Sequence, residues 1–108
     1  MLKTFKTYQL ALGFHKEVIQ EKIPGYLRDQ LFRASSSIAL NLAEGSGRMS
    51  RRDQVKFYFI ALGSLRECQA CLEFLPKKNP ALEEKADELG ACLYVLCQNM
   101  LKGSRKWN

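Results

Sequence analysis

The four cysteines are the residues of this sequence whose types and spacing come nearest to a chemical site. Cys68 and Cys71 form a CxxC pair, and Cys92 and Cys97 lie five residues apart. On helices, the members of the first pair lie about 60° apart and those of the second about 140° apart, at about 100° per residue. The divergent second pair suits a tetrahedral zinc site poorly. We therefore expect reduced thiols packed between helices, with no metal and no cofactor.

The single histidine and a glycine-rich loop offer the other routes to catalysis. His15 falls inside an apolar stripe at helical spacing, which is more typical of a hydrogen-bonded core or interface histidine than of a catalyst. The Gly-Ser-Gly sequence at 45–47 is not followed by the Lys-Ser/Thr pair of a P-loop, which argues against nucleotide hydrolysis. No nucleophile with a base and no pair of inward carboxylates can be assembled. The sequence therefore predicts a protein that is not an enzyme.

A basic segment gives the sharpest indication of a partner. Residues 48–56 carry four positive charges and only Asp53 as a counter-charge. Because a helix is expected to start after Ser50, these cations oppose the positive end of its dipole, and helix stability does not explain them. Phosphate groups fit better, since free backbone N–H groups are also expected there. We predict contact with a nucleic-acid backbone.

A second basic patch lies at the C-terminus, where Trp107 offers a ring on which a base can stack. The alternative is that both patches are ordinary solubilising charges. The predicted nucleic-acid-binding residues are Arg48, Arg51, Arg52, Lys56, Lys102, Arg105 and Lys106.

A row of polar residues follows one edge of the second apolar stretch, within an arc of about 80° on a helix. Its members are Gln30, Arg33, Ser37, Asn41 and Glu44. Small neighbouring residues allow another helix to approach closely, so we expect a partly buried, hydrogen-bonded row with a structural role rather than a ligand site. Arg33 and Glu44 are three turns apart, so each is expected to pair with another helix or another subunit.

Glycine and proline divide the chain into four stretches whose apolar residues recur at spacings of three and four. This pattern predicts four helices and no sheet: about residues 5–22, 26–44, 51–75, and a fourth from Pro80. Ser50 and Asn79 are the expected caps of the last two helices, and Gly45 is expected to end the second through a positive φ. Short connections favour an antiparallel, up-down-up-down four-helix bundle in one domain, residues 1–108. The first helix is expected to bury Phe5, Tyr8, Ala11, Leu12, His15, Val18 and Ile19.

The composition limits what such a protein can do. Its 108 residues are 46% apolar and 26% charged, enough for one core and too few for two ordinary domains. Seventeen Lys and Arg against eleven Asp and Glu leave a net charge of +6, which favours an anionic partner. The longest apolar run, residues 57–62, is too short to span a bilayer, and the basic N-terminus does not resemble a signal sequence. We expect a cytoplasmic protein with no membrane partner.

The third stretch has more apolar surface than one buried face can use. Phe59 lies about 100° from the centre of that face. Aromatic residues beside glycine and alanine on an outer helical face are typical of contact with another chain. We predict a homo-oligomer whose interface contains Phe59, Gly63, Arg66, Ala70 and Phe74. The alternative is that Phe59 packs sideways against a neighbouring helix.

Residues 27–73 resemble the signature of four-helix bundle proteins encoded in intervening sequences of bacterial 23S ribosomal RNA genes. The resemblance rests on Gln30 and Arg33, the run SSSIALNLAEGSGR at 35–48, and ALGSL at 61–65 with Glu67. The family usually has a proline soon after the Ser-Ile pair, where this chain has Ala39, so we expect a straighter second helix.

The resemblance implies a small cytoplasmic bundle that assembles as a ring, a homopentamer, with nucleic-acid binding and no enzymatic activity. It is similar in fold to accessory proteins of diversity-generating retroelements, which assist a reverse transcriptase and its RNA. Our leading hypothesis is a non-enzymatic, RNA-binding homo-oligomer; the alternative is a protein-interaction adaptor, such as an accessory subunit of a reverse transcriptase. The family-pattern residues are expected to shape the bundle and the ring: Arg33, Ser37, Asn41, Glu44, Gly63, Ser64 and Glu67.

Overall fold

The structure, a computed structural model, describes residues 2–102. A short 3-10 turn, η1 (Leu2–Thr4), precedes four α-helices, and no β-strand occurs within the described range. The helices are α1 (Lys6–Val18), α2 (Gly25–Ser46), α3 (Arg51–Glu73) and α4 (Pro80–Lys102). The predicted all-α fold with four helices is therefore confirmed.

Helices α3 and α4 start at the caps that the sequence predicts. The Ser50 hydroxyl oxygen accepts a hydrogen bond from the backbone N–H of Asp53 at 3.2 Å. The Asn79 side-chain oxygen accepts one from the backbone N–H of Leu82, also at 3.2 Å, and Pro80 is the first helical residue. Each cap satisfies an N–H group that the helix itself leaves without a partner.

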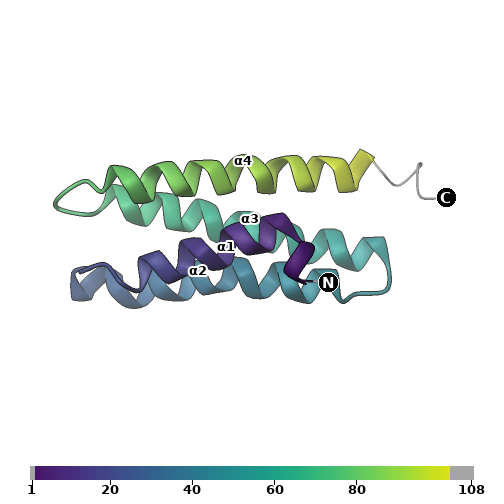
Figure 1. The fold of residues 1–108 in the computed structure, drawn as a ribbon, viewed down its shortest axis with the longest axis horizontal. Helices are drawn as coiled ribbons and strands as arrows, with labels where there is room; N and C mark the ends of the chain where they lie inside the picture. The colour runs from purple at the N-terminus through teal and green to yellow at the C-terminus, as the bar shows by residue number, and fades with distance from the viewer. Residues whose placement is uncertain (1, 103–108) are drawn as a thin grey trace.

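Hydrogen bonds between helices show how neighbouring helices run. Gln30 of α2 bonds to Glu67 of α3, whereas Ser37, further along α2, bonds to a residue earlier in α3, Ser64. These two helices are therefore antiparallel. Bonds join residues 69 and 87, and residues 51 and 100, across α3 and α4 in the same antiparallel sense. Helix α1 contacts α2 and α4. Figure 1 shows successive helices running in alternating directions, consistent with the expected up-down-up-down order.

The bundle is a rod with extents of 49 × 21 × 19 Å. One end, here called the α2–α3 end, holds the α2–α3 loop and the last turn of α4, and η1 lies in the half of the rod nearer to it (Figure 1). The other end, called the α3–α4 end, holds the α1–α2 and α3–α4 connections. Within residues 2–102, none of the helices combines the length and the apolar content that a membrane span requires.

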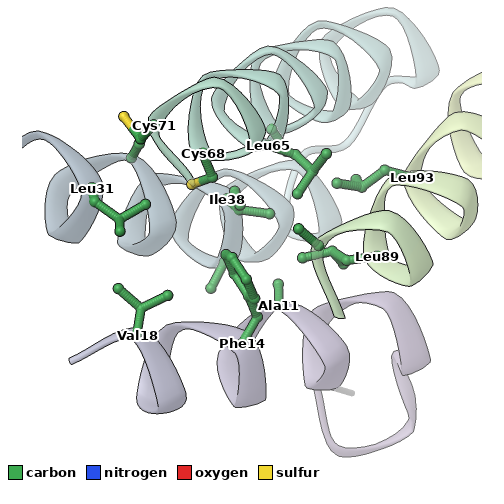
Figure 2. Packing of buried hydrophobic residues seen from close by; sticks show 14 of the residues in the cluster. Ala11, Phe14, Val18, Leu31, Ile38, Leu65, Cys68, Cys71, Leu89 and Leu93 are labelled. Carbon is green, nitrogen blue, oxygen red and sulfur yellow. The ribbon is translucent and has the colours of Figure 1, made fainter. Parts of the chain in front are cut away.

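Side chains from all four helices meet in one apolar core. Figure 2 shows Ala11, Phe14 and Val18 of α1 pointing toward the three longer helices. Phe14 was absent from the predicted stripe, whereas the predicted Ile19 is 46% exposed, so the buried face of α1 is rotated from the expected one. The longer helices contribute Leu31, Ile38, Leu65, Cys68, Cys71, Leu89 and Leu93 to the same view.

Helix α1 ends at Val18, several residues before the predicted end at residue 22. The chain turns out of the helix so that Ile23 enters the core, where it is 3% exposed. The carbonyl of Ile23 accepts a hydrogen bond from Arg28 Nη2 at 3.0 Å, which fixes the turn. The burial of one apolar side chain therefore overrides the local helical pattern.

The expected role of Gly45 is wrong. It has no positive φ and lies inside α2, which continues to Ser46. A Cβ atom at this position would stand 2.7 Å from Cε1 of the Tyr58 ring and 3.1 Å from Phe57 Cβ. The glycine is required because α3 approaches α2 too closely there for any side chain.

Candidate nucleic-acid interface

The fold brings most of the predicted nucleic-acid-binding residues to the α2–α3 end. The start of α3 and the end of α4 meet there, so Lys102 lies at the same end of the rod as residues 48–56 (Figure 1). Arg105, Lys106 and Trp107 lie outside the described residues. The described candidates fall into three different environments.

Arg48 is held in place from two sides. Its Nη2 atom lies 2.7 Å from Glu44 Oε2, and its guanidinium lies 4.8 Å from the centre of the Phe57 ring. The Arg48 side chain is nevertheless 44% exposed. Each exposed contact of this kind contributes at most about 1 kcal/mol, but together they hold the guanidinium in place at the loop while it stays partly exposed. Arg48 is therefore a positioned, accessible cation.

Arg51 is half-buried between α3 and α4. Its Nη1 atom donates to the backbone carbonyl of Met100 at 2.9 Å. That carbonyl is one of the last four in α4, and such carbonyls have no hydrogen-bond partner within their own helix. A cation at this end also interacts favourably with the negative end of the helix dipole. Arg51 therefore joins the start of α3 to the end of α4, and its environment differs from that of the other basic candidates.

Arg52, Lys56 and Lys102 are exposed. Within the described residues, their side chains form no ion pair or hydrogen bond. Charged groups in this state keep their full hydration and can exchange it for phosphate contacts at little cost. These three residues and Arg48 are the accessible part of the predicted site.

The polar row on α2 lies along the α2–α3 contact. Gln30 Nε2 donates to Glu67 Oε2 at 3.3 Å, and the Ser37 and Ser64 hydroxyls are 2.9 Å apart. Asn41 Nδ2 donates to the Ser37 carbonyl at 2.8 Å. The contacts connect two helices or adjacent turns, which fits a structural role.

One of the two charged members of the row, Glu44, differs from expectation. Glu44 pairs with Arg48, four residues later in the same chain, and needs neither another helix nor another subunit. Oppositely charged residues four apart are a signal for such a pair within a helix. The sequence did not give this signal clearly, because Arg48 lies beyond the end of α2 at Ser46. Arg33 is exposed, and its guanidinium has no hydrogen bond or ion pair among residues 2–102.

Three of the four thiols and the histidine lie in the structural environments that the sequence predicts, whereas Cys92 is only partly buried. Cys68, Cys71 and Cys97 are buried free thiols. Desolvation, with smaller contributions from Cys71 and Glu67, raises the pKa of the Cys68 thiol to about 12, so it stays protonated and unreactive near neutral pH. His15 Nδ1 lies 2.7 Å from the hydroxyl of the buried Ser35, and burial lowers the pKa of the imidazole. Among the described residues, no three potential metal-binding side chains form a group.

The predicted oligomer interface runs along the outer face of α3. Phe59 and Phe74 are exposed, and a Cβ atom added at Gly63 would meet nothing within 4 Å. Arg66 is exposed, and its Nη1 donates to Oε1 of Gln69 on the same helix at 2.9 Å; Gln69 Nε2 in turn donates to Asp87 Oδ1 of α4. Sequence reasoning missed three further exposed apolar residues, Tyr26 and Leu40 on α2 and Ile60 on α3.

The structure thus defines a class: a small, basic, all-α four-helix protein with accessible cations at one end of the rod and exposed apolar residues on its side. The family model described as "23S rRNA-intervening sequence protein" matches residues 3–103. The chain therefore belongs to the 23S rRNA-intervening sequence protein family, as the resemblance predicted. No curated protein and no solved structure matches the chain significantly.

Proposed function

We propose that this protein is a non-enzymatic, cytoplasmic homo-oligomer that binds RNA through the basic residues of its α2–α3 end. The observation that carries the proposal is the set of exposed cations Arg52, Lys56 and Lys102 beside the oriented guanidinium of Arg48. Phosphate contacts by such groups supply most of the affinity in sequence-independent binding. The family description names the intervening sequence of a 23S rRNA, so this RNA is the first to test as the anionic partner.

Exposed apolar residues support the oligomer. Tyr26, Leu40 and Phe74, from α2 and the end of α3, are 66–70% exposed. A second set of exposed apolar residues, Tyr94 and Val95, lies on α4. Two unlike apolar surfaces on one subunit suit a heterologous contact, in which one surface meets the other surface of the next subunit along the sides of the rods. Such contacts close into a ring when the rotation permits. The number five comes from the family resemblance.

Assembly would compensate for the small size of the basic site. A few phosphate contacts on one subunit give weak binding that falls steeply as salt rises. Several linked sites act at high effective concentration, so the whole ring binds more tightly than its parts. The same cations also fit an acidic protein, as the adaptor hypothesis requires, and binding measurements separate the two.

The test replaces three accessible cations and compares a matched control. The triple variant Arg48→Gln, Arg52→Gln and Lys56→Gln leaves Arg51 intact, because Arg51 supports α4. The control Lys22→Gln, Lys77→Gln and Lys78→Gln removes the same charge at the α3–α4 end. Fluorescence anisotropy with a labelled single-stranded 23S rRNA fragment, measured over a range of salt, reports affinity and its salt dependence.

We expect the triple variant to bind on the order of tenfold more weakly and the slope of log K against log salt to fall by about 2, at about 0.7 for each lost contact. The control should change affinity less than about twofold, since its charges lie elsewhere. Unchanged affinity in the triple variant would exclude this site. Binding of an acidic protein, with no RNA binding at physiological salt, would favour the adaptor.

A further inference from the structure

Charge is segregated along the long axis of the rod. Toward the α2–α3 end, residues 2–6, 44–56 and 102 contain only two acidic side chains, Glu44 and Asp53. Glu44 is already paired with Arg48. The basic side chains of these segments are Lys3, Lys6, Arg48, Arg51, Arg52, Lys56 and Lys102.

The α3–α4 end has the opposite balance. Residues 16–29 and 73–88 contain six basic side chains and eight acidic ones. Two of the six cations are also engaged: Lys85 forms an ion pair with Glu17, and Arg28 donates to the Ile23 carbonyl. A polyanion therefore meets attraction at one end of the rod and a net negative charge at the other.

The N-terminal segment is anchored near the basic end, which brings its two lysines within the basic half of the rod. The Phe5 ring packs edge-on against Tyr58 of α3, with 6.0 Å between ring centroids. The Leu2 carbonyl accepts hydrogen bonds from the backbone N–H of Phe5 and from Gln9 Nε2. These contacts hold η1 against the bundle, and the exposed Lys3 and Lys6 flank the anchored Phe5.

We propose that RNA contacts this protein only at the α2–α3 end, and that Lys3 and Lys6 are phosphate-binding residues of that site. This inference rests on the proposed function and adds two points to it: a binding segment outside α3 and α4, and the exclusion of the acidic end. Four separate chain segments then converge on the RNA, namely η1 with the start of α1, the α2–α3 loop, the first turns of α3, and the end of α4.

The test uses two variants that each remove two lysines from the first quarter of the chain. The variant Lys3→Gln and Lys6→Gln alters the basic end. The control variant Lys16→Gln and Lys22→Gln removes equal charge from exposed positions toward the opposite end. Binding is measured by anisotropy with the same labelled 23S rRNA fragment, and circular dichroism checks that both variants keep the helical content of the unchanged protein.

We expect the Lys3 and Lys6 variant to bind RNA several-fold more weakly. The slope of its log K against log salt should fall by about 1.4, at about 0.7 for each lost contact. The affinity of the control variant should stay within about twofold of that of the unchanged protein. Equal losses in both variants would mean that net charge alone governs binding, and would overturn the inference. No loss from Lys3→Gln and Lys6→Gln, while the triple variant still loses affinity, would overturn it and leave the proposed function intact. If the unchanged protein does not bind RNA, the proposed function itself is wrong.

Ultraviolet crosslinking gives a second test of where the RNA binds. Crosslinks to the RNA should fall at the α2–α3 end, and crosslinks at residues 73–88 would overturn the proposal that RNA contacts only this end.

Discussion

Gly45 and Tyr58 show how a single residue determines the geometry of the basic end. The missing side chain at Gly45 lets the Tyr58 ring lie against α2, and the same ring also packs against Phe5. Tyr58 is only 5% exposed, so it has little freedom to move. The approach of α3 to α2 and the position of the N-terminal segment therefore depend on the same contact.

Replacing Gly45 by alanine should destabilise the protein despite the higher helix propensity of alanine. The new methyl group would stand 2.7 Å from Tyr58 Cε1, so the ring and Phe5 must shift. Overpacking costs about 1–3 kcal/mol, which exceeds the gain of about 1 kcal/mol from removing a helical glycine. We expect a lower midpoint in urea unfolding, and partial recovery when Tyr58→Leu is added.

Gly13 provides the matched control, because it lies inside α1 and a Cβ atom there would meet nothing within 4 Å. Gly13→Ala should raise the free energy of unfolding by about 0.5–1 kcal/mol. If Gly45→Ala stabilised the protein as Gly13→Ala does, the close approach of Tyr58 would not restrict which residue fits at position 45.

At the scale of the helices, local signals were predictable and long-range contacts were not. The caps at Ser50 and Asn79 were predicted because cap and capped N–H lie three residues apart. The end of α1 was missed because it depends on where Ile23 finds space in the core. The Arg51 contact with Met100 joins positions 49 residues apart, so no local sequence pattern could have predicted it.

The candidate site was predictable only as a set of charges. The sequence located the cations of residues 48–56, but it treated them as equivalent. The fold divides them, since Arg48 is oriented by Glu44 and Phe57, Arg51 supports α4, and Arg52 is exposed. The anchoring that places the N-terminal lysines toward the same end depends on the Phe5 contact with Tyr58, which is a tertiary contact.

Arg51 should therefore matter for stability and Arg52 for binding. Arg51→Ala removes the bond to the Met100 carbonyl at the end of α4, and we expect a loss of about 1–2 kcal/mol in the free energy of unfolding. Arg52→Ala removes the same charge from the same first turn of α3, and should change stability by less than about 0.5 kcal/mol. Urea unfolding of the two variants makes the comparison, and equal losses would contradict the structural role of Arg51.

At the scale of the whole molecule, the side and the ends of the rod carry different properties. The α2–α3 end is basic, whereas the apolar residues Phe59, Ile60 and Phe74 lie along the length of α3. A side-to-side contact between parallel subunits would leave the ends free and gather the basic ends on one face of the assembly. Oligomerisation and RNA binding would then use separate surfaces, so that each can be altered without the other.

The assembly is tested by placing a charge on the side of the rod. Phe59→Glu puts a carboxylate on the proposed interface, and desolvating an unpaired charge there is costly, so we expect smaller species by light scattering after size exclusion. Met49→Glu is the matched control, because Met49 is fully exposed in the α2–α3 loop and away from that face. It should keep the mass of the unchanged protein, a multiple of 12.4 kDa. An unchanged mass for Phe59→Glu would place the interface elsewhere, whereas dissociation by both variants would mean that negative charge alone, rather than the α3 surface, controls assembly.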